Sequence, residues 1–105
     1  MTAAREKLPN RRASFSFNFN CGAHQYTATV SYFPGSDRIA EIFLGNGRAG
    51  SDVDATAKDS AILASIGLQF GAPLNVLRKA LLRDSQGRAS TPIGCVLDLL
   101  AERQS

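Results

Sequence analysis

Length, composition and charge indicate one ordinary globular domain and exclude several classes of protein. The chain has 105 residues, of which 44% are hydrophobic and 20% are charged. This balance is too apolar for a disordered chain and too interrupted by polar residues for a membrane span of about 20 apolar positions. The first residues lack the apolar segment of a secretory signal, so we expect a cytoplasmic protein with one core.

The net charge of +3 comes from the N-terminal residues. Residues 1–12 carry four basic side chains against Glu6, whereas the other 93 residues hold eight basic and eight acidic side chains. We therefore expect a basic flexible arm over residues 1–13 and a single domain over residues 14–105. Such an arm either tracks nucleic-acid phosphates or is a solubilising leader. The remaining chain has equal numbers of basic and acidic side chains, and this balance argues against nucleic-acid binding.

Alternating residues predict three antiparallel strands. Residues 14–20 read SFSFNFN, which places three phenylalanines on one face. A turn at Gly22 leads to a second alternating segment over residues 26–33, and a turn that begins at Pro34 leads to a third over residues 39–44. The predicted meander has one apolar face and one face of serine, asparagine and threonine.

The third strand is ambiguous at Phe43. If Ala40, Ile42 and Leu44 face the core, Phe43 points outward together with Glu41. An outward phenylalanine is either an ordinary exposed residue or an anchor for a subunit contact.

Residues 47–73 predict a helix that is apolar on two faces. Ser51 or Asp52 suits its start, and Gly71 suits its end. At 100° per residue, one narrow stripe holds Ala57, Ala61, Ala64 and Leu68, and a bulkier stripe roughly opposite holds Ile62, Leu63, Ile66 and Phe70. Both stripes need cover, so we expect a homodimer or larger assembly. The predicted interface residues are Phe43, Ile62, Ile66 and Phe70.

Two shorter helices complete the predicted fold. Pro73 suits the first turn of a helix over residues 73–83, and Thr91 suits the cap of a last helix that begins at Pro92. The residues expected to face the core are Leu74, Leu77, Ala80 and Leu81 in the first helix and Ile93, Val96, Leu97 and Leu100 in the second. We expect an α+β fold, a three-stranded antiparallel meander followed by three helices packed on one face, in the order βββααα.

A basic cluster in the folded region is the predicted partner-binding surface. Its members are Arg78, Lys79, Arg83 and Arg88. Lys79 and Arg83 are four residues apart, so on one helix they repel by a few tenths of a kcal/mol, and a bound anion would relieve that repulsion. The cluster is therefore either a solvated helix face or a surface for an acidic partner or a phosphate.

The two cysteines do not have the spacing of a zinc site. Cys21 and Cys95 are far apart, and His24 lies near only one of them. We expect free thiols, with Cys95 packed as a small apolar residue; the alternatives are a disulfide between the two, or a weak metal site of Cys21, His24 and Cys95. We predict neither a metal nor a cofactor.

The sequence contains no convincing catalytic set. His24, Asp59, Ser60 and Ser65 are the candidate residues, and none has a recognisable partner at a fixed spacing. We therefore expect a binding or regulatory module and not an enzyme.

Three motifs at the junctions resemble a known family. They are AEIFLGNGRAGS, DSAILASIGLQFGAPL and DSQGRASTPIG. Together with the order of elements they resemble the TSCPD domain, which is found at the C-terminal end of certain ribonucleotide reductase large subunits, notably cobalamin-dependent ones, and as small free-standing bacterial and phage proteins. The resemblance covers about residues 24–100. Its most specific parts are residues 41–44, residues 50–51 and residues 68–74.

The chain departs from the motif that names this family. Thr91 stands where the reductase domain has its cysteine, and Ile93 stands where it has aspartate, so the resemblance does not transfer the family cysteine to Cys95. It implies a non-catalytic accessory or interaction protein whose partner is its own copy, a reductase large subunit or a nucleoprotein, with no membrane. The alternative is a phage or mobile-element adaptor that inhibits a host complex, or a weak nucleic-acid-binding protein.

Overall fold

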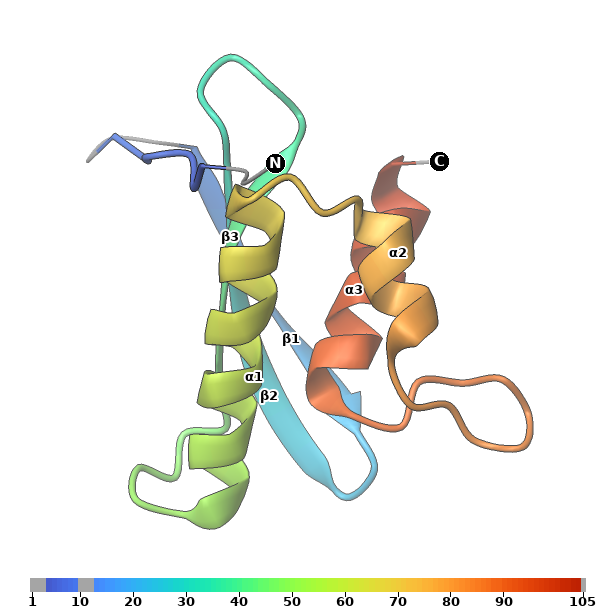
Figure 1. Ribbon diagram of the computed structural model, residues 1–105. Coiled ribbons are helices and arrows are strands. Elements are labelled where there is room, and N and C mark those ends of the chain that lie inside the picture. The colour runs from blue at the N-terminus through green and yellow to red at the C-terminus, as the bar shows by residue number, and fades with distance from the viewer. Residues whose placement is uncertain (1–3, 10–12, 105) are drawn as a thin grey trace.

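A computed structural model describes residues 4–9 and 13–104 of the chain. It confirms the α+β fold and the order βββααα. Helix α1 lies beside β3, and α2 and α3 lie next to each other (Figure 1). No helix in these residues is long and apolar enough to cross a membrane. The elements are β1 (Ser14–Cys21), β2 (His24–Tyr32), β3 (Ile39–Gly45), α1 (Asp52–Gln69), α2 (Leu74–Ala80) and α3 (Pro92–Gln104).

The three strands form an antiparallel sheet in the order β1-β2-β3. The β1–β2 register runs from Ser14 opposite Ser31 to Cys21 opposite His24. Gly22 turns the hairpin with a φ of 59°, a value that glycine adopts without the steric cost of a Cβ atom. This register places the three phenylalanines of β1 on the same face as the buried side chains of β2.

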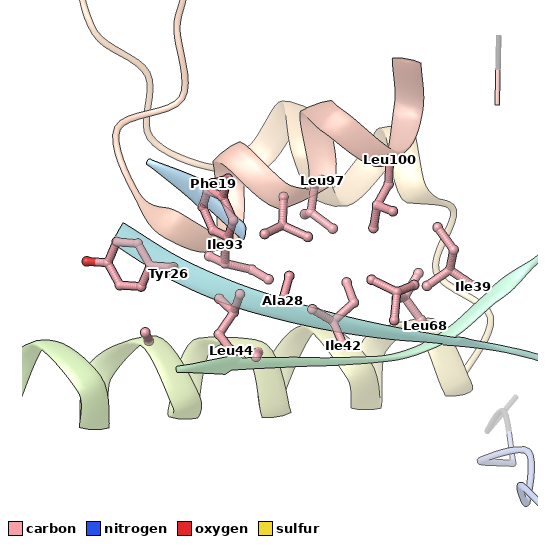
Figure 2. Close-up of a cluster of buried hydrophobic side chains, with 14 residues drawn as sticks. Phe19, Tyr26, Ala28, Ile39, Ile42, Leu44, Leu68, Ile93, Leu97 and Leu100 are labelled. Carbon is pink, nitrogen blue, oxygen red and sulfur yellow. The ribbon is translucent and has the colours of Figure 1, made fainter. Parts of the chain in front are cut away.

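The apolar face of the sheet supplies most of the core. Its buried side chains lie between the sheet and α3, as Figure 2 shows. They include Tyr26, Ala28, Val30, Ile42 and Leu44 from the sheet and Ile93, Val96, Leu97 and Leu100 from α3. On the opposite face, Ser16 and Thr29 share a hydrogen bond of 2.8 Å, and so do Thr27 and Asn18, at 2.7 Å.

Helix α1 lies along the outer edge of β3. The amide of Ile42 donates to Ser65 Oγ at 2.9 Å, and Gln69 Nε2 donates to the carbonyl of Ala40 at 3.0 Å. These strand groups are the ones that β2 does not use, because alternate residues of an antiparallel strand point their polar groups to opposite sides. The helix therefore covers a strand edge that would otherwise be open to pairing.

The small residues of α1 allow this close approach, as predicted. Ala57 and Ala61 are buried, and Ser51 caps the helix by accepting from the amide of Asp54 at 3.1 Å. Asp54 is buried as well and pairs with Lys58 at 2.8 Å. Hydrogen bonding from Lys58 holds the pKa of Asp54 below its usual range.

The prediction for the second helix was wrong at its C-terminal end. α2 ends at Ala80 and not at residue 83, and Ala80 is exposed although we expected it in the core. The backbone becomes extended at Leu81, where ψ is 158°. Arg83 therefore lies outside the helix and forms an antiparallel β-bridge with Ala89. With only two turns, the helix lacks the length that would sustain it without tertiary support.

Residues 4–9 of the predicted arm contact the end of α1. The amide of Glu6 donates to the carbonyl of Gln69 at 2.9 Å, and Arg38 pairs with the Glu6 carboxylate at 2.7 Å. Of the four basic side chains of the arm, Arg5 donates to Gln69 Oε1, and Arg11 and Arg12 lie outside the described residues.

Candidate functional site

A pocket of about 660 Å³ lies where the β1–β2 turn meets the first turns of α3. The loop between α2 and α3 forms its third wall. The charged and thiol side chains that line the pocket are those of Cys21, Asp84, Arg88, Cys95 and Asp98. Both cysteines and one member of the predicted basic cluster therefore share one pocket.

Cys21 and Cys95 lie side by side although 74 positions separate them. Their Sγ atoms are 3.4 Å apart, and the Cys95 thiol is placed to donate to Cys21 Sγ. Both are free thiols and half-buried. Burial, followed by the hydrogen bond to Cys21, raises the pKa of Cys95 to about 12, so this residue stays a neutral thiol at pH 7. The sequence interpretation of Cys95 as a small packed thiol is compatible with this, but it missed the neighbouring sulfur.

His24 does not complete a metal site with the two thiols. It faces Cys21 across the hairpin, but it is exposed and its ring lies edge-on to Tyr26, with the centroids 6.3 Å apart. Across residues 4–9 and 13–104, no group of three or more potential metal ligands comes together. The described side chains thus offer a two-sulfur site and no zinc-type ligand set.

Asp98 pairs with two of the four members of the predicted basic cluster. Its carboxylate accepts from Arg83 at 2.8 and 2.9 Å in a bidentate pair, and from Arg78 Nε at 3.0 Å. Hydrogen bonding from Arg83 lowers the pKa of Asp98, and Asp98 in turn raises the pKa of Arg83. Arg83 also donates to the carbonyls of Gly87 and Arg78, so it ties α3, α2 and the loop together.

A second acidic residue, Asp84, holds the loop that carries Arg88. Its Oδ1 accepts the amides of Gln86 and Arg88, both at 2.9 Å, and its Oδ2 lies 3.4 Å from Arg88 Nε. The amide of Arg88 is the main cause that lowers the pKa of Asp84. The Arg88 side chain is 72% exposed and stays accessible to solvent.

The repulsion on which the predicted cluster was based is absent. Lys79 is in α2 and Arg83 is beyond its end, so the two are not on one helix. Lys79 and Arg88 are the exposed members, whereas Arg78 and Arg83 act as structural cations around Asp98. The missed residues left a faint signal: Asp84 precedes a Ser-Gln-Gly turn, and Asp98 flanks a buried stripe of α3.

The bulky stripe of α1 is mostly uncovered. Leu63, Ile62 and Phe70 are 71%, 51% and 44% exposed, and Ile66 is half-buried. Phe43 is 49% exposed and belongs to β3, the strand against which α1 packs. Single exposed apolar residues are common, but several on one helix form a surface suited to association.

The two candidate catalytic serines have structural partners. Ser65 is buried and bonds to the backbone of β3 and of α1, and Ser60 donates to the carbonyl of Ala57 at 2.8 Å. Asp59 is exposed. The geometry brings none of these hydroxyls to His24.

The fold and site define a small α+β domain with a pair of thiols in a surface pocket and an open apolar helix face. Its sequence is similar to a short segment of vitamin B12-dependent ribonucleotide reductases. The reductase of Agrobacterium fabrum is 40% identical over 70 residues, which are 67% of this chain and 5% of that protein. The reductase of Bradyrhizobium diazoefficiens is 36% identical over 72 residues (68% and 6%), and that of Rhodopirellula baltica is 30% identical over 73 residues (70% and 7%).

These comparisons confirm the resemblance to a ribonucleotide reductase segment. The chain spans only about 5–12% of the length of the curated relatives it matches, as expected for similarity to one small domain of a long protein. No family model matches the chain, and no solved structure gives a significant match.

Proposed function

We propose that this chain is a non-catalytic accessory module that acts by binding protein, related to the small domain of ribonucleotide reductases. One observation carries the proposal: the similarity covers two thirds of this chain but a small share of each reductase. A segment of this size is a domain attached to a larger enzyme, and a related chain suits a role beside such an enzyme.

The surface of the domain supports a binding role. The apolar stripe of α1, with Ile62, Leu63 and Phe70 exposed, is a candidate contact with a second copy of the chain. Lys79 and Arg88 are the accessible cations for an acidic surface of a further partner. The candidate catalytic serines meanwhile hold backbone groups in place.

The direct test uses a vitamin B12-dependent ribonucleotide reductase from the same organism. The purified chain is expected to co-elute with the reductase and to turn over no ribonucleotide by itself. Replacing both Lys79 and Arg88 with glutamate is expected to weaken capture about tenfold at moderate salt, since rim charges mainly affect association. The control is Arg48→Glu, an exposed cation in the loop between β3 and α1, outside this surface.

Two results would contradict the proposal. Ribonucleotide turnover by the isolated chain would show that it is an enzyme. Failure to bind the reductase, with the fold verified by circular dichroism, would remove the reductase as the partner.

A further inference from the structure

The thiol pair is the feature of the pocket that the proposed function does not use. Cys21 is the last residue of β1, and Cys95 is in the first turns of α3. The 3.4 Å between their sulfurs exceeds the roughly 2.05 Å of a disulfide bond by little more than 1 Å. Side-chain adjustment of that size requires no refolding of the strand or the helix.

The site is also open to a reagent. Both side chains are half-buried, and both line the pocket of about 660 Å³, which is in the size range of small-molecule sites. The Cys95 thiol is placed to donate its proton toward Cys21 Sγ, and it stays protonated at pH 7 because burial raises its pKa. Attack on an incoming reagent therefore begins at Cys21, and Cys95 is positioned to act second.

We propose that Cys21 and Cys95 form a thiol–disulfide exchange site for low-molecular-weight disulfides, closing reversibly into an intramolecular disulfide. In the first step the Cys21 thiolate attacks one sulfur of the small disulfide, forms a mixed disulfide and releases one small thiolate. That thiolate takes up the Cys95 proton, and Cys95 Sγ then attacks Cys21 Sγ and displaces the second small thiolate. The second small thiolate takes up from solvent the proton that Cys21 released when it became the thiolate. The protein dithiol is thus oxidised by two electrons, and one small disulfide is reduced to two small thiols.

The new bond would fasten the β1–β2 hairpin to α3. Its two ends are 74 positions apart, and a cross-link that closes so long a loop removes much of the freedom of the unfolded chain. We expect the oxidised form to melt at least about 5 °C above the reduced form. The reduced form is expected to return on treatment with excess small thiol.

The experiment uses the full chain equilibrated in buffers of reduced and oxidised glutathione. Samples are quenched with acid, alkylated and analysed by intact mass and peptide mapping. In the wild type, both thiols are expected to disappear together and a Cys21–Cys95 linked peptide to form. Cys95→Ser is expected to trap glutathione on Cys21, whereas Cys21→Ser reacts at Cys95 at least about tenfold more slowly, because that thiol is protonated.

Several outcomes would overturn the proposal. One is a folded wild type that keeps both thiols free in a buffer that oxidises the urea-unfolded chain. Another is accumulation of glutathione adducts, or of disulfides between two chains, without the internal link. If a serine variant fails to fold by circular dichroism, the matching alanine variant replaces it; equal rates for the two folded single variants would refute the assigned order of attack.

Discussion

Ser65 shows how one small side chain joins a helix to a strand edge. It accepts from the amide of Ile42 at 2.9 Å and donates within α1 to the carbonyl of Ala61 at 2.8 Å, both in a buried environment. Removing the acceptor of a buried amide costs more free energy than removing the acceptor of an exposed amide, because the exposed amide can bond to water instead. The residue that sequence reasoning considered as a nucleophile is therefore a structural hydroxyl.

We predict that Ser65→Ala lowers the free energy of unfolding by about 1–3 kcal/mol, because the Ile42 amide is left without its acceptor. Ser60→Ala is the matched control, since Ser60 bonds only to its own helix and gains the same helix propensity; it should change stability by less than about 0.5 kcal/mol. Urea denaturation measures both variants. Equal effects would mean that the bond to β3 contributes nothing specific.

Asp98 gives a pH-dependent contribution whose sign follows from its lowered pKa. Hydrogen bonds from Arg83, and then from Arg78, favour its ionised form in the folded state. The stability it provides is thus present above its unfolded pKa of about 3.9 and is lost as pH falls through the lower folded value. Asp54 and Asp84 shift in the same direction.

Replacing Asp98 with asparagine is therefore expected to destabilise the protein by about 1–2 kcal/mol at neutral pH. The difference from the wild type should shrink as pH falls from about 4 through the lower folded pKa of Asp98, because the wild-type carboxyl then becomes protonated too. Thermal melts over this pH range provide the measurement. A gap that persists unchanged at low pH would show that the effect of Asp98 is steric and not electrostatic.

At the scale of elements, the open stripe of α1 is the surface through which we expect copies of the chain to associate. Its opposite face is occupied by β3, so the exposed side chains of Ile62, Leu63 and Phe70 are free to meet another surface. An interface between two copies buries the same patch on each when it has twofold symmetry.

We predict a homodimer at micromolar concentration, measured by light scattering. Phe70→Asp should convert it to a monomer or weaken association at least tenfold, because it places a charge in an apolar contact. Ser85→Asp, which adds a charge at an exposed residue of the loop between α2 and α3, away from the stripe, is the control and should leave the dimer intact. A monodisperse wild-type species near the 11.2 kDa chain mass would refute the dimer.

At the scale of the whole molecule, folding depends on the core between the sheet and α3. That core is built from apolar side chains such as Val30, Ile42, Val96, Leu97 and Leu100. Burial of this apolar surface is the main term that favours the folded state.

We predict that a metal chelator leaves the melting temperature unchanged within about 1 °C, because the described residues bring together no set of three metal ligands. The melt should be run with the chain fully reduced, so that the thiol pair does not alter the comparison. Stoichiometric zinc in elemental analysis, lost together with structure on chelation, would contradict this expectation.

Local patterns in the sequence determined the order of elements and most of their limits. The alternation of residues 14–20, a cap at Ser51 or Asp52 and the stop near Gly71 each depend on a few neighbouring residues. The structure confirms the strand and the stop, and it selects Ser51 as the cap. The two stripes of α1 were visible for the same reason, since 3.6 residues per turn defines which side chains share a face.

Only the tertiary structure decided the chemistry of the pocket and the state of the basic cluster. The contact between Cys21 and Cys95, and the pairing of Asp98 with Arg78 and Arg83, depend on how α3 docks against the hairpin and α2. No local spacing encodes such pairings, because they join residues that are distant in the chain and meet only when the apolar faces pack. The early end of α2 has the same origin: Arg83 leaves the helical path and pairs with Asp98 on another element.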